Sequence, residues 1–264
     1  MTAKKPQSMS TTNSIPRSWG RARLRGKVAV VTGGSRGIGY AIARTLAAEG
    51  CNLVITGRDL AALKKAAAQL AKSAVAQTKS SQIIPVACDV RDSESVASLF
   101  AEVKQRFGKV DILVNNAGIT QPVLSVEDTS LELWHDVIET NLTGIFLCTR
   151  AALPLMKAGA TIVNNLSAAA KQVFPNYATY SAAKRGALGF TLSLREELVP
   201  RGIRVMALMT GATAPGMWDQ IMPNAPRERM IDVNSVAQAV LYAALLPPNV
   251  NPSELCLDPT AGAL

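Results

Sequence analysis

The 264-residue sequence predicts a three-layer, doubly wound α/β fold with a parallel sheet of about seven strands. Short apolar runs alternate with longer segments whose apolar residues recur at helical spacing. A helical segment of this kind separates nearly every apolar run from the next one. Parallel strands need such a connection, because the chain must cross back to the other end of the sheet before the next strand begins. Apolar residues make up 48% of the chain and charged residues 18%, so a sizeable core can form.

The first half of the chain is predicted to contain four strands and three helices. The strands are short runs rich in β-branched residues, which favour extended structure. The expected strands are Val28–Thr32, Asn52–Thr56, Gln82–Ala87 and Val110–Val114. The expected helices are Ile38–Glu49, Leu60–Ala76 and Ser93–Phe107, the last with Asp92 as its N-terminal cap.

The second half continues the alternation, with an irregular segment rich in Gly, Pro and Met after the sixth strand. The expected helices are Ser130–Met156, Tyr177–Leu198 and Ser235–Leu246. The expected strands are Thr161–Asn165, Ile203–Leu208 and Glu254–Leu257. We find no internal repeat and no linker after residue 26, so residues 24–264 are predicted to form a single domain.

Residues 1–23 are rich in Ser, Thr, Lys and Arg and lack the apolar stretch of a secretory signal. This composition fits either an organelle transit peptide or a disordered tail, the latter with Met9 as an alternative start. We predict a disordered basic tail. Most of the net charge of +9 lies there and in the next few residues, so the body of the protein does not resemble a nucleic-acid-binding surface.

The composition excludes several classes of protein. No apolar run approaches the roughly 18 residues of a membrane span. The four cysteines are widely separated and form no C-x-x-C pair, which indicates reduced thiols in a cytoplasmic protein. His135 is the single histidine, so a His-rich metal centre is excluded and we expect no metal site.

A glycine-rich turn, Thr32–Gly39, lies between the first predicted strand and helix. It has the form T-G-x-x-x-G-x-G. Glycines there allow the backbone to approach a pyrophosphate closely, and the amino end of the helix offers free N–H groups to the anion. The setting between a strand and a helix predicts a dinucleotide site.

The second predicted strand indicates which dinucleotide binds. In folds that bind NAD, this strand usually ends in an acidic residue that holds the ribose hydroxyls. Here it ends with Gly57–Arg58 and no carboxylate, and Arg36 lies inside the glycine turn. Two guanidinium groups suit a 2′-phosphate, although both could also be solvated surface arginines. We therefore predict NADP(H).

Ser167, Tyr180 and Lys184 have the spacing S-x12-Y-x3-K. Residues four apart share a helix face, so the Tyr180 and Lys184 side chains can enter one cleft. Ser167 follows a predicted strand, at the carboxyl end of the sheet. A nearby ammonium group favours the phenolate and is expected to lower the pKa of the tyrosine, which could then exchange a proton with a carbonyl or alcohol.

These motifs together resemble the short-chain dehydrogenase/reductase family over roughly residues 24–260. The resemblance rests on T-G-G-S-R-G-I-G at 32–39, C-D-V at 88–90, N-N-A-G at 115–118, Asn141, Ser167 and Y-S-A-A-K at 180–184. Y-x-x-x-K alone would be mostly chance, but the set in this order is specific. The resemblance implies a Rossmann fold and hydride transfer by a nicotinamide cofactor.

The resemblance also implies roles for individual residues. Asp89 would hydrogen-bond the adenine beside Val90, Asn115 would hold the central strand, and Asn141 would hold a water that relays protons from Lys184. The predicted catalytic residues are Asn141, Ser167, Tyr180 and Lys184. The predicted cofactor-binding residues are Gly33, Ser35, Arg36, Gly37, Ile38, Gly39, Arg58, Asp89, Val90, Asn116, Ala117, Gly118, Tyr180, Lys184, Gly211 and Thr213.

The loop after the sixth strand departs from the family pattern Asn-x-x-x-Pro-Gly-x-x-x-Thr. Gly211 is kept, whereas Met206, Thr210 and Pro215 replace the asparagine, proline and threonine. Thr213 could take over the contact of the missing threonine with the nicotinamide carboxamide. The carboxyl-terminal residues also differ from the V-D-G-G that is frequent in the family.

The predicted function is that of an NADP(H)-dependent carbonyl reductase, acting on a small molecule or on an acyl group, as 3-oxoacyl-[acyl-carrier-protein] reductases do. Expected pocket residues are mostly small or apolar, and they include Ala168, Ala169, Val173, Phe174 and Tyr177, with a lid around Met217, Trp218 and Ile221. Lys171 and Arg185 could attract an acidic carrier protein, although scattered cations usually serve only solubility.

Two other functions stay open. One is an NADP-dependent alcohol, steroid or sugar dehydrogenase, and the other is a nucleotide-binding regulatory or scaffold protein with little turnover. The family resemblance also implies a homodimer or homotetramer, because Ser130–Met156 and Tyr177–Leu198 correspond to the helices that pair between subunits.

Overall fold

The computed structural model describes residues 23–75, 81–214 and 224–262. Seven strands form one sheet in the order β3-β2-β1-β4-β5-β6-β9, and every neighbouring pair is parallel. They are β1 (Val28–Thr32), β2 (Asn52–Gly57), β3 (Ile83–Ala87), β4 (Ile112–Asn115), β5 (Thr161–Asn165), β6 (Arg204–Thr210) and β9 (Glu254–Leu257). The predicted doubly wound fold is confirmed.

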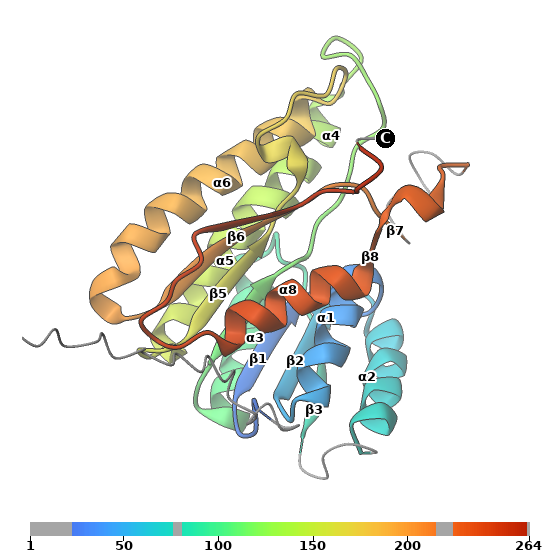
Figure 1. The fold of residues 1–264 in the computed structure, drawn as a ribbon. Helices are drawn as coiled ribbons and strands as arrows, with labels where there is room; N and C mark the ends of the chain where they lie inside the picture. Colours follow the sequence, from blue (N-terminus) through green and yellow to red (C-terminus); the bar gives the residue numbers. More distant parts are fainter. Residues whose placement is uncertain (1–22, 76–80, 215–223, 263–264) are drawn as a thin grey trace, which may run out of the picture.

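Helices cover both faces of the sheet (Figure 1). Helices α1 (Gly37–Ala48), α2 (Leu60–Val75) and α8 (Val233–Leu245) pack on one face. Helices α3 (Ser93–Phe107), α5 (Gly144–Ala152) and α6 (Ala178–Leu198) pack on the other, and α4 (Leu131–Ile138) precedes α5. Among the described residues, no helix is long and apolar enough to cross a membrane.

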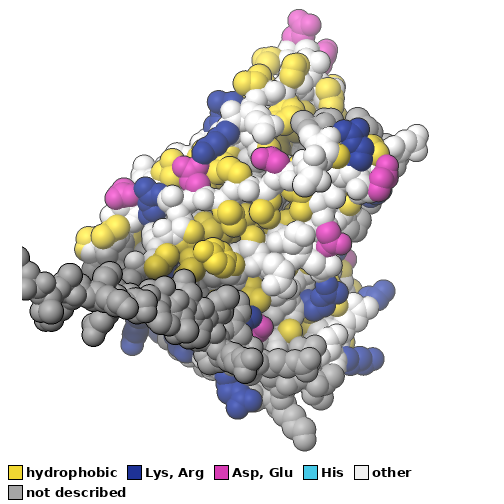
Figure 2. Space-filling model, viewed as in Figure 1, with side chains coloured by type: hydrophobic (Ala, Val, Ile, Leu, Met, Phe, Trp, Pro, Cys, Tyr) yellow, Lys and Arg dark blue, Asp and Glu magenta, His cyan; other side chains and the backbone are white. Residues whose placement is uncertain are grey.

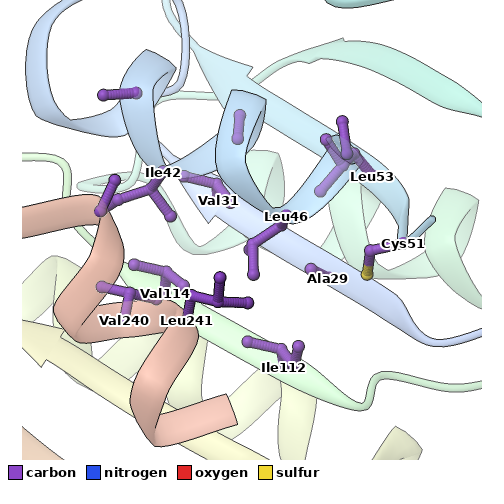
Figure 3. Close-up of a cluster of buried hydrophobic side chains, with 14 of the residues drawn as sticks. Ala29, Val31, Ile42, Leu46, Cys51, Leu53, Ile112, Val114, Val240 and Leu241 are labelled. Atoms are coloured by element: carbon purple, nitrogen blue, oxygen red, sulfur yellow. The ribbon is translucent and has the colours of Figure 1, made fainter. Parts of the chain in front are cut away.

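The two cores follow from the alternation of side chains along each strand. Ala29 and Val31 of β1 point into the core beneath α1 and α8, where they lie among Ile42, Leu46 and Val240 (Figure 3). Val30, between them, belongs to the core on the opposite face. Because both faces are covered, the whole strand is apolar, which explains the continuous apolar runs in the sequence.

The first described residues pack against the rest of the domain. Leu24 is buried in the core beneath α1, and its N–H donates to the Glu49 carbonyl. Arg23 pairs with the Glu49 carboxylate at 2.9 Å. The predicted disordered tail lies almost entirely outside the described residues, and its disorder stays a prediction.

The strand order reverses between β1 and β4, so the loops that follow these two strands diverge to opposite sides of the sheet. Ligands of open α/β sheets bind at such a point, outside the carboxyl ends of the strands. The glycine turn follows β1, the N-N-A-G segment follows β4 and Ser167 follows β5. The fold therefore brings the three predicted motifs together at the carboxyl ends of the central strands.

The predicted single helix Ser130–Met156 is wrong, because the structure divides it. Helix α4 passes into a π-helical turn, Glu139–Thr143, then into α5 and finally into a 3₁₀ turn, Leu153–Leu155. The Asn141 side-chain amide donates to the Val137 carbonyl at 3.0 Å and so competes with the backbone. Gly144 N–H reaches back five residues to Glu139, as a π turn requires.

The segment after the sixth strand is more regular than predicted. Strand β6 continues to Thr210 because Met209 and Thr210 pair with β9. Two short strands, β7 (Thr213–Ala214) and β8 (Ile231–Asp232), then form a separate parallel pair. Two-residue strands are too short to leave a period in the sequence, so neither was predicted.

Candidate active site

The backbone of the glycine turn has a conformation that residues with a side chain adopt only with strain. Gly33 and Gly37 have φ angles of +66° and +56°. A Cβ on Gly39 would lie 2.2 Å from the Gly33 carbonyl oxygen, so the turn and the first turn of α1 are in direct backbone contact. The predicted requirement for glycine at these positions therefore has a steric reason.

The amino end of α1 is open to an anion. Arg36 is the N-cap residue, and no side chain among the described residues caps this end by a hydrogen bond. The unpaired N–H groups and the helix dipole both favour a phosphate there. The Ile38 side chain packs against the core, so only the backbone of this residue would be available to the phosphate. Ser35 is half-buried within the turn.

Two arginines lie beside this open end without a partner of their own. Arg36 and Arg58 are both exposed, and neither has a hydrogen bond or ion pair within the described part of the chain. Arg58 is near enough to Asp89 for its charge to help lower the pKa of that carboxyl group. Both guanidinium groups are therefore available to a ligand anion.

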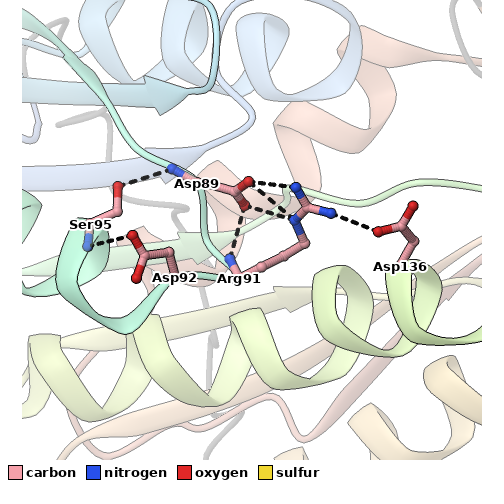
Figure 4. A network of polar contacts seen from close by, with 5 residues as sticks. All are labelled: Asp89, Arg91, Asp92, Ser95 and Asp136. Atoms are coloured by element: carbon pink, nitrogen blue, oxygen red, sulfur yellow. Dashed lines mark hydrogen bonds and ion pairs between the residues drawn. The ribbon is translucent and has the colours of Figure 1, made fainter. Parts of the chain in front are cut away.

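Asp89 is held by a neighbour that the sequence analysis did not single out (Figure 4). The Arg91 guanidinium contacts both Asp89 oxygens, with a closest distance of 2.7 Å, and also reaches Asp136 of α4 at 2.7 Å. The Arg91 hydrogen bond is the main cause of a lowered Asp89 pKa. The position of Arg91, two residues after Asp89 in the sequence, could have indicated this ion pair.

A network of polar groups ties the glycine turn to β4 and β5. The Thr32 hydroxyl accepts from the N–H groups of Asn116 and Ala117 at 2.9 Å each. The Asn116 side chain donates to the Thr32 carbonyl at 2.9 Å and accepts from the Asn165 amide at 2.9 Å. Asn116 thus holds the glycine turn with both its backbone N–H and its side-chain amide, while Val90 and Ala117 line one small pocket.

Tyr180 and Lys184 lie one helical turn apart on α6 and are almost fully buried, with 7% and 4% of their surface exposed. The Lys184 Nζ is 5.5 Å from the centre of the Tyr180 ring and donates to the Asn165 carbonyl at 3.4 Å. The Ser167 side chain hydrogen-bonds Tyr180. The structure therefore brings together the three residues that the S-x12-Y-x3-K spacing predicted.

The protonation of this group differs from the prediction in one respect. Burial raises the pKa of Tyr180, and the Ser167 hydrogen bond offsets this only in part, so the expected lowering of the pKa is wrong. Burial lowers the pKa of Lys184 to about 8. Removal from water is the largest cause of the pKa shift of each group. Near neutral pH, the phenol is protonated and most of the lysine is charged.

Asn141 and Lys184 approach each other across Gly118. A Cβ on Gly118 would lie 2.7 Å from Asn141 Oδ1 and 3.6 Å from Lys184 Nζ. Asn141 is fully buried, and its side chain exchanges hydrogen bonds with the backbone N–H and carbonyl of Ile119. Glycine at position 118 thus keeps the space between the two side chains open.

Gln121, which was not predicted as a site residue, is buried beside helix α6. Its Oε1 accepts from the Tyr180 N–H at 2.7 Å, and its Nε2 donates to the Asn176 carbonyl at 3.4 Å. Its neighbour Thr120 contacts the Tyr177 hydroxyl. No local pattern marks such a residue, because its partners are more than 50 positions away in the chain.

The loop after β6 is only partly described. Gly211 packs so closely on Pro259 that a Cβ would lie 2.8 Å from the proline ring. Thr213 is buried, and its hydroxyl donates to the Gly211 carbonyl at 3.0 Å. The expected lid residues Met217, Trp218 and Ile221 lie outside the described residues. Among those described, no group of acidic, Cys or His residues could hold a metal ion.

A family model described as short chain dehydrogenase matches residues 27–226. The chain belongs to the short-chain dehydrogenase family. The predicted family is thus confirmed, and the chain is an oxidoreductase. It is 39% identical to a 3-oxoacyl-[acyl-carrier-protein] reductase from Synechocystis over 231 residues, which cover 85% of this chain and 91% of the relative.

Solved structures of short-chain dehydrogenases share the whole architecture. An alcohol dehydrogenase from Thermococcus sibiricus, in complex with 5-hydroxy-NADP, superposes with a TM-score of 0.80 at 31% identity. The match covers 89% of this chain and 97% of that one. A 3-ketoacyl-(acyl-carrier-protein) reductase from Brucella melitensis, in complex with NADH, has a TM-score of 0.80 at 29% identity and covers 90% and 99%.

Proposed function

We propose that this short-chain dehydrogenase transfers a hydride between NADP(H) and a carbonyl or alcohol group, with Tyr180 as the proton donor and acceptor. The observation that carries the proposal is the buried pair Tyr180 and Lys184, with the half-buried Ser167 beside Tyr180, at the carboxyl end of the sheet. A buried phenol that is hydrogen-bonded to a hydroxyl and faces an ammonium group suits proton exchange with a substrate oxygen.

The residues around the glycine turn fit NADP(H). The open amino end of α1 would take the pyrophosphate, and the exposed Arg36 and Arg58 would take the 2′-phosphate. We propose that the rest of the cofactor contacts Asp89, Val90, Ala117 and Gly118. Its nicotinamide end would contact Gly211 and Thr213. The bound nicotinamide supplies or accepts the hydride. Since solved relatives hold NADP or NADH, the choice rests on the two arginines.

The protonation states favour reduction near neutral pH. Tyr180 has a raised pKa and therefore carries the proton that a developing alkoxide needs. Ser167 would hydrogen-bond the substrate oxygen, and Lys184, charged below about pH 8, would stabilise negative charge on the phenol oxygen. Asn141 lies across Gly118 from Lys184, where it would support the return of the proton from solvent.

The substrate is proposed to be an apolar carbonyl compound. Val173 is 81% exposed near the site, and Tyr177 and Phe174 are partly buried beside Tyr180. A 3-oxoacyl substrate is favoured by the 39% identical reductase. Docking of an acidic carrier through the predicted cations has less support, because Lys171 pairs with Glu254 and Arg185 donates to the backbone of Lys171. On the face in Figure 2, Lys and Arg side chains are interspersed with Asp and Glu.

The Tyr180→Phe variant tests the proposed reaction. It removes the proton donor and keeps the ring, so we expect NADPH-dependent carbonyl reduction to fall at least about a hundredfold while NADPH still binds. A scan of carbonyl substrates with both proteins gives the measurement. If no substrate is reduced by the wild type although NADPH binds, the chain is a nucleotide-binding regulatory or scaffold protein. Preference for alcohols, steroids or sugars would identify the dehydrogenase alternative.

The Arg58→Ala variant tests the cofactor. Because a charged hydrogen bond to the 2′-phosphate would be lost, we expect NADPH affinity to fall about ten- to a hundredfold and NADH affinity to change little. Arg25→Ala is the matched control, since that exposed arginine precedes β1 at the other end of the sheet. Tighter binding of NADH than of NADPH by the wild type would contradict the assignment.

A cytoplasmic location and a homodimer or homotetramer are proposed as well. All four cysteines are free thiols, and three of them are buried, as expected in a reducing compartment. Phe146 of α5 is 44% exposed and forms an edge-to-face pair with Phe190 of α6 at 6.2 Å. An aromatic pair with one exposed ring and one half-buried ring on these two helices supports pairing of this face between subunits.

A further inference from the structure

The segment from Ile119 to Leu124, which follows the N-N-A-G motif, packs against the amino end of α6. Gln121 is its most buried side chain, with 1% of its surface exposed. It joins two points of the chain that are more than 50 residues away. Its Oε1 accepts a hydrogen bond from the Tyr180 N–H at 2.7 Å, and its Nε2 donates to the Asn176 carbonyl at 3.4 Å. Both polar atoms of this buried amide are therefore paired.

Helix α6 needs an external cap because its own sequence provides none. The first N–H groups of a helix have no partner within the helix, and a Ser, Thr, Asp or Asn side chain usually accepts one of them. Here the N-cap residue is Tyr177, whose side chain caps nothing. The preceding Asn176 has a φ angle of +60°, so the chain turns sharply just before the helix. Gln121 caps the helix from a distant loop.

We infer that Gln121 is a positioning residue for Tyr180: it fixes the first turn of α6 and thereby the place of the phenol oxygen. This inference rests on the proposed function of Tyr180. The same segment supports the ring from the side, because Thr120 contacts the Tyr177 hydroxyl and the Tyr177 ring lies edge-on to Tyr180 at 5.3 Å. Misplacement of a reacting group by about 1 Å can cost about a hundredfold in rate.

The neutral charge of the cap also matters to the reaction. A carboxylate at this helix end would be favoured by the helix dipole and would still accept from the Tyr180 N–H, but it would have no donor for the Asn176 carbonyl. It would also place a negative charge near the Tyr180 phenol in a buried site, where it would oppose formation of the phenolate. An amide caps the helix without this effect. The charge of residue 121 should therefore appear in the pH dependence of the reaction.

Two substitutions separate positioning from stability. Gln121→Met keeps the shape and removes the acceptor, and we expect kcat for carbonyl reduction by NADPH to fall about ten- to a hundredfold, with NADPH affinity within about twofold of wild type. Gln121→Glu keeps an acceptor for the Tyr180 N–H. We expect it to recover most of the kcat and to move the alkaline rise of alcohol oxidation to higher pH.

Thr191→Val is the matched control. It removes a buried hydrogen bond on α6, between Thr191 and Asn164, far along the helix from Tyr180. We expect it to lower stability and to leave kcat unchanged. Urea unfolding of each variant shows whether a fall in kcat follows loss of the fold or loss of the cap.

The outcomes distinguish this inference from the proposed function. If Tyr180→Phe abolishes turnover and folded Gln121→Met keeps the wild-type kcat, the positioning role is wrong and the proposed function stands. If Tyr180→Phe keeps turnover, the proposed function fails, and the role of Gln121 fails with it. Should Gln121→Met not fold, Gln121→Asn decides, because its shorter side chain withdraws the acceptor from the Tyr180 N–H: a wild-type kcat in the folded variant overturns the inference.

Discussion

Lys184 is a buried ammonium group that no carboxylate balances among the described residues. Its one hydrogen bond there is to the Asn165 carbonyl at 3.4 Å, and burial lowers its pKa to about 8 from 10.5. Removing a charge from water without a partner opposes folding. The residue is therefore retained at the expense of stability, which is common where a side chain serves a reaction.

We predict that Lys184→Met stabilises the fold at pH 7 by about 1–3 kcal/mol while it abolishes turnover. Below about pH 8, lysine is charged in both the folded and the unfolded protein, so the wild type bears the full penalty of burial. Between pH 8 and 10.5, the folded state releases its proton first and the wild type gains stability. The advantage of the variant should therefore shrink at pH 9.5.

Urea unfolding at the two pH values measures this difference. Lys64→Met, at an exposed position of α2, is the control and should change stability little at either pH. Equal stability of Lys184→Met and the wild type at pH 7 would show that the burial of the ammonium group carries no penalty.

The residues of the site that could be predicted are those whose partners lie nearby in the sequence. Tyr180 and Lys184 share a helix face, and the glycines of the turn lie within seven positions. Gln121 could not be predicted, because its function depends on a helix end that only the tertiary structure brings close. The direction of the Tyr180 pKa was also wrong, since burial cannot be measured from spacing.

At the scale of elements, a row of buried polar side chains joins the central strands to the catalytic helix. The Asn115 amide of β4 donates to Asn164 of β5 at 2.8 Å, and Asn164 donates to Thr191 of α6 at 2.9 Å. Thr191 in turn donates to the Ala187 carbonyl at 2.6 Å. Parallel register places Asn115 directly beside Asn164. The row ties the part of α6 around Thr191, about three turns beyond Tyr180, to the sheet.

We predict that Asn164→Leu destabilises the protein by about 2–4 kcal/mol, because it removes one hydrogen-bond partner from each of two buried groups, Asn115 and Thr191. Urea unfolding of Asn164→Leu, Thr191→Val and the double variant gives the coupling energy. The double variant should be less destabilised than the sum of the two single variants. Strict additivity would show that the row does not act as a unit.

The elements that the sequence predicted well are those with an uninterrupted apolar period. All seven strands of the main sheet were placed to within a few residues, because buried parallel strands are continuous apolar runs. The helix at Ser130–Met156 failed because a single polar side chain, Asn141, competes with the backbone inside an otherwise regular pattern. Periodicity describes faces of a helix, and it does not detect such local competition.

At the scale of the whole molecule, the helices α5 and α6 leave an aromatic pair in contact with solvent. We predict that Phe146→Glu reduces the mass of the assembly in solution, because a charge would have to be buried where the two subunits meet. Light scattering after size exclusion gives the mass. Leu60→Glu, at an exposed apolar residue of α2, is the control and should leave the mass unchanged.

An unchanged mass for Phe146→Glu would place the subunit contact elsewhere. A wild type that elutes as a monomer would contradict assembly altogether. The apolar side chains that gather across the middle of the face in Figure 2 would then be the next surface to test.

The π turn at Glu139–Thr143 also constrains how the chain can change in length. A π turn holds one residue more than an α-helical turn, so deletion of one residue there would let α4 and α5 join as a single regular helix. Since the extra residue is held within that one turn, the deletion would leave the faces of α4 and α5 in register and would remove only the widened turn. Asn141, which lies within the π turn, would leave its place beside Gly118, whereas Phe146 of α5 would keep the face it shares with Phe190. Insertions and deletions tolerated in the surface loops should therefore be absent from these five positions in functional relatives.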